Sequence, residues 1–286
     1  MNKVWIALLG LALAVSCKKN DSWIPYGPGS NGQGGGGTGG GGTGGGSSLV
    51  VSRVQNAFAI NFSGNWCGPC GANGIPALNN LSTTHGAKFS GIKVGLNDPF
   101  TVPEGSTMAS QYGVSGIPAY VAGADFLQSS SAWTSAINTI VATVPANVKA
   151  GVALRRTKVG DSIYVDTKAE FFQAVPAGNY SLAVFLVENN IALSQAGQSD
   201  PNFKHKMVFR GGATAIPSTA VTGVWGEQLE SNNTAIPQGK TYEIKFGYVA
   251  PSVTPSVNLN NVQAIAVIFE TDNSGKPLRV LNSNRI

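Results

Sequence analysis

Two cysteines separated by two residues carry the strongest chemical signal in this chain. Cys67 and Cys70 lie in the run W-C-G-P-C at 66–70, shortly after the apolar stretch 57–62. The apolar stretch is typical of a buried strand, and Pro69 suits the first turn of a helix. A strand-to-helix junction places Cys67 beside unpaired backbone N–H groups and the positive helix end, which favour a thiolate. The pattern predicts a redox-active pair that closes to a disulfide or opens to a dithiol.

The energy needed for this activation is modest. A free thiol with a pKa near ~8.5 is only ~3% thiolate at pH 7, and a pKa of about 7 raises that fraction to ~50%. The shift corresponds to roughly 2 kcal/mol, which a helix start with direct N–H donors can supply. Gly68 and Pro69 carry no acid or base, so the electrostatic help must come from the helix end.

Other uses of the cysteine pair need partners that the chain hardly offers. A zinc site requires two further ligands, and the only histidines are His85 and His205. A cysteine protease requires a nearby histidine, but His85 precedes Gly86 in a pattern typical of a helix end, which favours a capping or surface position. A purely structural disulfide stays open, because exported domains use short-loop disulfides. We expect neither a metal nor a cofactor.

The start of the chain has the pattern of a lipoprotein signal peptide over residues 1–16. Lys3 precedes an apolar run over 4–15 that is too short to span a bilayer comfortably. Residues 13–17 resemble a bacterial lipobox, in which Cys17 is the residue that receives the lipid; an ordinary signal peptide cleaved nearby is the alternative. The glycine-dominated stretch within 17–48 predicts a flexible tether between membrane and folded part.

Length and charge narrow the class of protein. A chain of 286 residues can hold two domains. The net charge of +5 comes from scattered lysines and arginines rather than from a basic cluster, which argues against nucleic-acid binding.

Residues 49–146 alternate between strand and helix patterns, which predicts an α/β layer with parallel pairing. The expected strands cover 50–54, 57–62, 89–96 and 119–122, and the expected helices cover 69–85, 104–112 and 130–144.

Residues 147–286 change to period-two patterns separated by Gly, Pro and Asn turns. The clearest is 162–171, where apolar and polar residues alternate as in a half-buried strand. The fold class predicted for the whole chain is therefore an α/β domain followed by an all-β antiparallel, Ig-like sandwich. The other expected strands cover 152–157, 180–188, 207–210, 242–248, 262–270 and 278–281.

The W-C-G-P-C run, followed by G-V-S-G-I-P at 113–118, resembles the thioredoxin superfamily. The resemblance implies a thioredoxin-like fold and a cis peptide bond before Pro118, which faces the cysteines and pairs with a substrate backbone. It implies Cys67 and Cys70 as the catalytic residues. The substrate-binding residues that it implies are Trp66, Gly68, Pro69, Ile117 and Pro118.

Two positions depart from that family's pattern. Asn61 stands where thioredoxins carry a buried aspartate that moves protons, which an amide cannot do near neutral pH. The helix proline expected five residues after Cys70 comes six residues after it, at Pro76, which predicts a bulge or a different helix start.

Four stretches of the second half, 182–191, 203–210, 225–227 and 262–282, are similar to parts of a known family. On these stretches, the chain resembles bacterial lipoproteins related to the outer-membrane protein of twenty-eight kilodaltons. The resemblance implies the two-part architecture and an outer-membrane location. His205 and Arg210 fall on alternating strand positions, where we interpret them as structural or solvated, with a ligand site as the alternative.

These patterns together predict an exported, membrane-anchored thiol–disulfide oxidoreductase acting through Cys67 and Cys70. Its expected partners are protein thiols or disulfides, with the membrane reached through the lipid anchor on the periplasmic or the outer face. The alternative is an outer-membrane or surface binding lipoprotein, in which the sandwich binds a partner and the cysteine pair is a structural disulfide.

Overall fold

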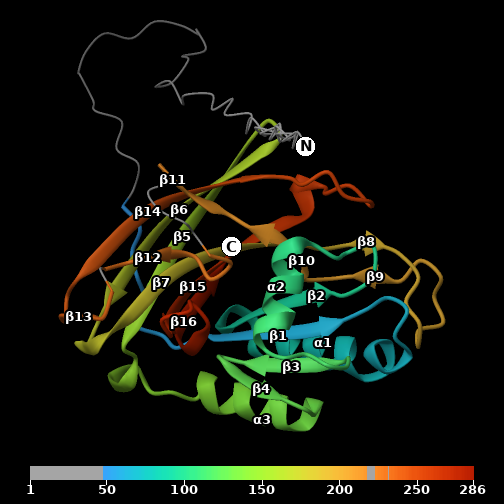
Figure 1. The fold of residues 1–286 in the computed structure, drawn as a ribbon, viewed down its shortest axis with the longest axis horizontal. Coiled ribbons are helices and arrows are strands. Elements are labelled where there is room, and N and C mark those ends of the chain that lie inside the picture. Colours follow the sequence, from blue (N-terminus) through green and yellow to red (C-terminus); the bar gives the residue numbers. More distant parts are fainter. Residues whose placement is uncertain (1–47, 218–222, 231) are drawn as a thin grey trace, which may run out of the picture. The chain divides into compact units, whose positions relative to one another are not determined.

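The computed structural model of the protein describes residues 48–217, 223–230 and 232–286. The predicted signal peptide, Cys17 and all but the last residue of the tether lie outside these residues. The chain is mostly β-sheet with few helices, as Figure 1 shows. Within the described part, none of the helices has the length and apolarity that a bilayer crossing requires.

Three α-helices and sixteen strands make up the described fold. The helices are α1 (Ile75–His85), α2 (Pro103–Gln111) and α3 (Ser130–Val141), and a π-helical turn at Cys70–Gly74 precedes α1. The strands are β1 (Ala57–Ser63), β2 (Phe89–Gly95), β3 (Ala119–Ala122), β4 (Asp125–Leu127), β5 (Ala150–Val159), β6 (Ser162–Phe171), β7 (Val175–Glu188), β8 (Ile191–Ala192), β9 (Lys204–His205), β10 (Val208–Gly212), β11 (Thr214–Ile216), β12 (Glu227–Gln228), β13 (Thr234–Ile236), β14 (Thr241–Val249), β15 (Val262–Thr271) and β16 (Pro277–Arg285).

The largest sheet is mixed and has ten strands in the order β16-β15-β7-β10-β2-β1-β3-β4, with β12 and β13 also paired to β7. β1 and β2 pair in parallel, and β10 joins β2 in parallel at the single register pair Val208↔Lys93. A second, antiparallel sheet has the order β11-β14-β6-β5, and β8 pairs with β9 in a two-stranded ribbon. The first part of the chain and the second part therefore meet within one sheet.

Strand β1 is buried on both faces, and each face serves a different core. Phe58, Ile60 and Phe62 belong to a core with α2, β7 and β15. The alternate residues Ala57 and Ala59 belong to a second core, with residues of α1 and α3. Because side chains alternate along a strand, Asn61 lies on the α1 side. This is the face on which the helix start carrying Cys70 is placed.

Strands β7 and β15 are also buried on both faces. One face packs against the four-stranded sheet. The other face carries Phe185 and Phe269, whose ring centroids lie 5.6 and 5.8 Å from that of Phe58. The boundary expected between 146 and 147 falls between α3 and β5, but the large sheet and this aromatic core both cross it. The described residues from 48 onward accordingly belong to one compact unit.

The strand expected at 50–54 is wrong, because these residues have no regular secondary structure. The place beside β2 that an additional strand would fill is taken by β10. The backbone instead bonds to the side chain of Asn282, whose Nδ2 donates to Val54 O at 2.8 Å and whose Oδ1 accepts from Asn56 N at 2.9 Å.

The bulge expected in the first helix is present as the π-helical turn Cys70–Gly74. Its last bond runs from the N–H of Ile75 to the carbonyl of Cys70, five residues earlier. The turn takes up one extra residue, so Pro76 still falls in the first turn of α1, where its missing N–H costs nothing. The other expected elements are confirmed with small changes at their ends, and the helix expected over 130–144 ends at Val141.

Candidate redox site

Cys67 and Cys70 are joined by a disulfide bond at the junction between β1 and the π-helical turn. Cys67 is 4% exposed and Cys70 is completely buried, so only the first sulfur lies near the surface. The backbone N–H of Cys70 donates to Cys67 Sγ at 3.1 Å. An N–H donor and the positive end of a helix both stabilise negative charge, so this geometry suits a thiolate on Cys67 when the bond opens.

The segment before Pro118 closes one side of the disulfide. Cys67 Sγ lies 3.7 Å from the carbonyl oxygen of Ile117, and the Ile117–Pro118 peptide bond is cis. Pro118 lies below the helix start, because a Cβ added at Gly74 would come within 3.0 Å of Pro118 Cβ. The two motifs, about fifty residues apart in the sequence, therefore meet in space as the resemblance implied.

The outer side of the motif is open. Trp66 is 56% exposed and its Nε1 donates to the carbonyl of Leu96 at 3.1 Å, which fixes the ring beside the end of β2. Pro69 is exposed and Gly68 is partly exposed. All seven residues predicted for catalysis and substrate binding thus come from two neighbouring segments, 66–70 and 117–118, around one sulfur.

Asn61 is buried on the α1 face of β1, beneath the helix start. A Cβ added at Gly74 would lie 3.3 Å from Asn61 Nδ2, and Nδ2 donates to the carbonyl of Ala119 at 3.5 Å. Among the described residues its Oδ1 has no hydrogen-bond partner. The side chain is placed where the resemblance puts a proton-carrying aspartate, but an amide supplies no proton at neutral pH.

A loop from the second half of the chain packs directly on the cysteine motif, which the sequence did not predict. The buried Gln195, between β8 and β9, donates through Nε2 to the carbonyls of Gly64 and Cys67, both at 3.1 Å. The N–H of Ala196 donates to Asn65 O at 2.8 Å, and Gln198 Nε2 donates to Gly71 O at 2.6 Å. The motif is therefore held from both halves of the chain.

The cysteine motif and the loop between β8 and β9 approach so closely that neither has room for a side chain at two glycine positions. A Cβ added at Gly71 would come 2.0 Å from the carbonyl oxygen of Ala196. A Cβ added at Gly197, where φ is +83°, would come 2.3 Å from the carbonyl oxygen of Gly68. Only glycine permits such a close approach of two backbones.

The base of the same loop is fixed by a buried pair of basic side chains. His205 is completely buried, and its Nδ1 lies 2.7 Å from Lys93 Nζ while its Nε2 lies 3.1 Å from the carbonyl oxygen of Leu193. Burial, and then the charge of Lys93, lower the pKa of His205 to about 3. Burial likewise lowers the pKa of Lys93 to about 7. The neutral histidine accepts from Lys93 and donates to Leu193, which fixes its tautomer.

Arg210 forms a buried ion pair and is not solvated. Its Nε lies 3.1 Å from Glu188 Oε2, and both side chains are almost fully buried. Together with the burial of His205, this supports the structural interpretation of both residues over the solvated one.

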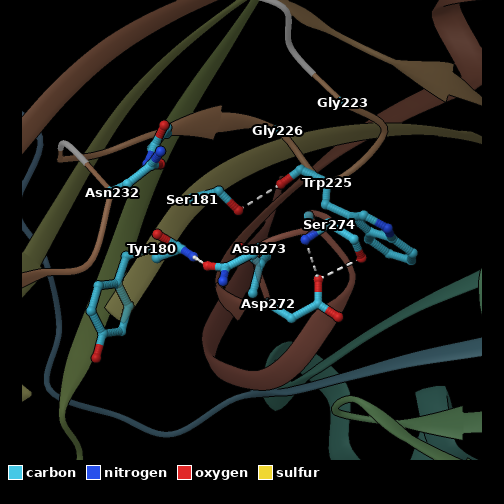
Figure 2. A pocket seen from close by; sticks show the side chains of 13 residues that line it. Tyr180, Ser181, Gly223, Trp225, Gly226, Asn232, Asp272, Asn273 and Ser274 are labelled. Carbon is cyan, nitrogen blue, oxygen red and sulfur yellow. Dashed lines mark hydrogen bonds between the residues drawn. The ribbon is translucent and has the colours of Figure 1, made fainter. Parts of the chain in front are cut away.

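A second candidate site is a polar pocket of about 430 Å³ between β7, the β15–β16 turn and the segment around Trp225. Figure 2 shows hydrogen bonds between residues that line it: Ser181 Oγ donates to Trp225 O at 2.8 Å, and Ser274 Oγ donates to Asp272 at 2.6 Å. Among the residues that the structure describes, no cysteine or histidine lines it. The pocket offers polar contacts but no nucleophile of the kind that the cysteine motif supplies.

The described chain thus combines a mostly β fold with a disulfide-bonded C-x-x-C motif at a strand-to-helix junction. Residues 105–285, more than half of the chain, match the family described as outer membrane protein Omp28, so the chain belongs to that family. The expected outer-membrane localisation is confirmed by this membership. The matched residues begin after Cys70 and contain neither cysteine of the motif.

Solved structures resemble the chain in fold. HBP35 of Porphyromonas gingivalis is 15% identical, with a TM-score of 0.62 over 83% of this chain and 76% of that one. Protein AGR_C_4864 from Agrobacterium tumefaciens is 11% identical, with a TM-score of 0.50 over 82% and 95%. A domain of the outer membrane lipoprotein Omp28 from P. gingivalis is 16% identical, covers 48% and 94%, and has a TM-score of only 0.30. No curated protein matches the sequence.

Proposed function

We propose that this protein is a lipid-anchored thiol–disulfide oxidoreductase of the outer membrane, whose partners are thiols or disulfides of other proteins. The observation that carries the proposal is the pair Cys67–Cys70, with one sulfur near the surface beside the cis peptide bond of Ile117–Pro118. On this proposal β1–β4 with α1–α3 form a thioredoxin-like unit, β5–β16 build an Ig-like sandwich beside it, and Cys17 carries the lipid.

The exposures of the two sulfurs suggest their roles. The thiolate of Cys67 attacks a partner disulfide, a new Cys67–partner bond forms, and the second partner sulfur leaves as a thiolate. The buried Cys70 then attacks Cys67 Sγ and releases the first partner sulfur, so two electrons pass to the partner and the cysteine pair ends as the disulfide described here. The reverse sequence oxidises a partner dithiol.

The open side of the motif suggests where a partner chain lies. Trp66 and Pro69 are exposed next to Cys67, and Ser115 and Gly116 are exposed in the segment that leads to the cis bond. A partner strand laid against 115–117 meets the exposed residues Ser115 and Gly116 and brings its cysteine to Cys67 Sγ. Trp66 then supplies apolar contact area beside the reacting sulfurs.

The decisive experiment traps the mixed disulfide in cells. The Cys70→Ser variant keeps the attacking thiol but cannot release its partner, so partner proteins accumulate as species that disappear on reduction. The double variant Cys67→Ser/Cys70→Ser is the matched control, because it retains Cys17 and lacks the pair. Absence of any trapped species in Cys70→Ser, or equal amounts in the double variant, would refute the proposal.

A second candidate function is binding by the C-terminal half, with the cysteine pair as a structural disulfide. The polar pocket beside Trp225 favours it, because this pocket lies outside the redox motif and exposes the amides of Asn232 and Asn273 (Figure 2). Cells that carry Cys67→Ser and keep the full wild-type phenotype would support this candidate. Loss of the phenotype from that single change would count against it.

A further inference from the structure

The segment 195–198 of the second half makes four hydrogen bonds to the backbone of the cysteine motif. Two come from Gln195 Nε2, to Gly64 O and Cys67 O, and one comes from Gln198 Nε2, to Gly71 O. In the fourth, the N–H of Ala196 donates to the carbonyl oxygen of Asn65. Gly64 precedes Cys67 and Gly71 follows Cys70, so the segment bonds to the backbone on both sides of the disulfide in the sequence.

The orientation of the Gln195 amide follows from its surroundings. Its Nε2 is within 3.1 Å of three carbonyl oxygens, those of Gly64, Cys67 and Ala196. An amide oxygen in that place would face three acceptors without a donor, so the nitrogen must point to them. The side chain is 2% exposed, and a buried bond of this kind is costly to lose.

Opening the disulfide changes the geometry that these bonds match. Two sulfurs that are no longer bonded move to van der Waals separation, so the Sγ atoms of Cys67 and Cys70 move apart and the side chains that carry them change position. Gly71 and Gly197 lie in backbone contact with the opposite segment, so the motif cannot expand on that side without displacing residues 195–198. Hydrogen bonds that fit one redox state better than the other shift the equilibrium toward that state.

We propose that the segment 195–198 is part of the redox site and favours its disulfide form, with Gln195 and Gln198 as positioning residues. The proposal deepens the function proposed above and depends on it. It means that the second half of the chain sets how readily Cys67–Cys70 accepts electrons.

The test is redox equilibration of the full chain with dithiothreitol. One reagent thiolate attacks Cys67 Sγ and expels Cys70, the second closes the reagent's ring, and two electrons and two protons pass to the cysteine pair. For Gln195→Ala/Gln198→Ala we expect the equilibrium constant for reduction to rise roughly tenfold, which corresponds to about 30 mV. Gln173→Ala is the matched control, because Gln173 makes the same kind of bond to a backbone carbonyl, that of Ala146, away from the motif.

A second readout separates positioning from stability alone. Because coupling is reciprocal, reduction of wild-type protein should increase hydrogen exchange at the N–H of Ala196 by a similar factor. A double variant that only loses stability, with an unchanged reduction constant, overturns the inference and leaves the proposed function standing. If the Cys67–Cys70 disulfide cannot be reduced in the wild type or in any variant, both the inference and the proposed function are refuted. If the double variant fails to fold, the single change at the partly exposed Gln198 gives the same comparison.

Discussion

His205 should make the folded protein sensitive to acid, and the effect can be worked out from its contacts. Lys93 Nζ donates to Nδ1 of His205 at 2.7 Å, and Nε2 of His205 donates to the carbonyl of Leu193. Protonation of Nδ1, which would charge the ring, therefore requires the loss of its hydrogen bond from Lys93. Burial and the neighbouring Lys93 lower the pKa of His205 from 6.5 to about 3. Between these two pH values the unfolded chain binds one proton more than the folded chain, so the free energy of unfolding falls as the pH decreases.

The magnitude follows from the width of that pH interval. A fully developed difference of one proton changes the free energy of unfolding by about 1.4 kcal/mol per pH unit. Acidification from pH 6.5 to about pH 4.5 should therefore remove roughly 2–3 kcal/mol that His205 contributes at neutral pH. For a domain whose total stability is on the order of 5–15 kcal/mol, this loss is easily measured.

The assay is urea unfolding at several pH values, with His205→Gln as the variant. A glutamine amide can donate to Leu193 and accept from Lys93 but does not titrate, so the variant should lose less stability on acidification by the same 2–3 kcal/mol. Carboxylates titrate equally in both proteins and cancel in the difference. His85→Gln, which changes the other histidine of the chain at a partly exposed position, is the matched control variant. Parallel pH profiles for wild type and His205→Gln would refute the reasoning.

Three further predictions concern buried polar groups. Burial lowers the pKa of Lys93 from 10.5 to about 7, so between these pH values the unfolded chain binds one proton more than the folded chain. The free energy of unfolding of the wild type should therefore rise with pH in this range. Lys93→Met should abolish that rise, as measured by urea unfolding. Glu188→Gln leaves the buried guanidinium of Arg210 without its counter-charge, so the free energy of unfolding from chemical denaturation should fall by about 3–5 kcal/mol. A smaller decrease would indicate that water reaches the site. Asn61→Asp supplies a buried carboxyl below the helix start, so disulfide exchange with a small dithiol should accelerate, and an unchanged rate would show that this position takes no part in proton movement.

The local patterns of the sequence predicted most elements because these elements follow from local periodicity. The alternation over 162–171 gives β6 with the same bounds, Ser162–Phe171. The apolar stretch 57–62 gives β1, and the proline displaced to Pro76 gives the π-helical turn. In each case the signal lies within a short stretch of sequence, where side-chain periodicity or proline geometry determines the local structure.

The parts that were missed depend on contacts between distant residues. Gln195 and Cys67 are 128 positions apart, and a glutamine in a loop rich in small and polar residues has no periodic signal. Strand β10 lies beside β2 because its other neighbour, β7, belongs to the second half and is itself paired with β15. Nothing in the stretch 50–54 reveals that the place beside β2 is occupied. Lys93 lies in a predicted strand with a polar alternate face, but only the packing of β9 against that face shows that it is buried.

The arrangement of β2 links the two candidate functions physically. Lys93 is in register with Asn61 on β1, and its backbone N–H donates to Met207 O at 2.7 Å just before β10. Its side chain also holds His205, which bonds to the loop that contacts Cys67. A partner that binds the second half and moves β8 or β9 must therefore alter the surroundings of the disulfide. If such a partner binds, the same coupling would make its affinity depend on the redox state of the cysteine pair. Oxidation of the cysteine pair and partner binding would then depend on each other, because both act on the same folded unit. Such coupling requires rigid contacts between the two halves of the chain, and the sheet that joins them supplies these contacts.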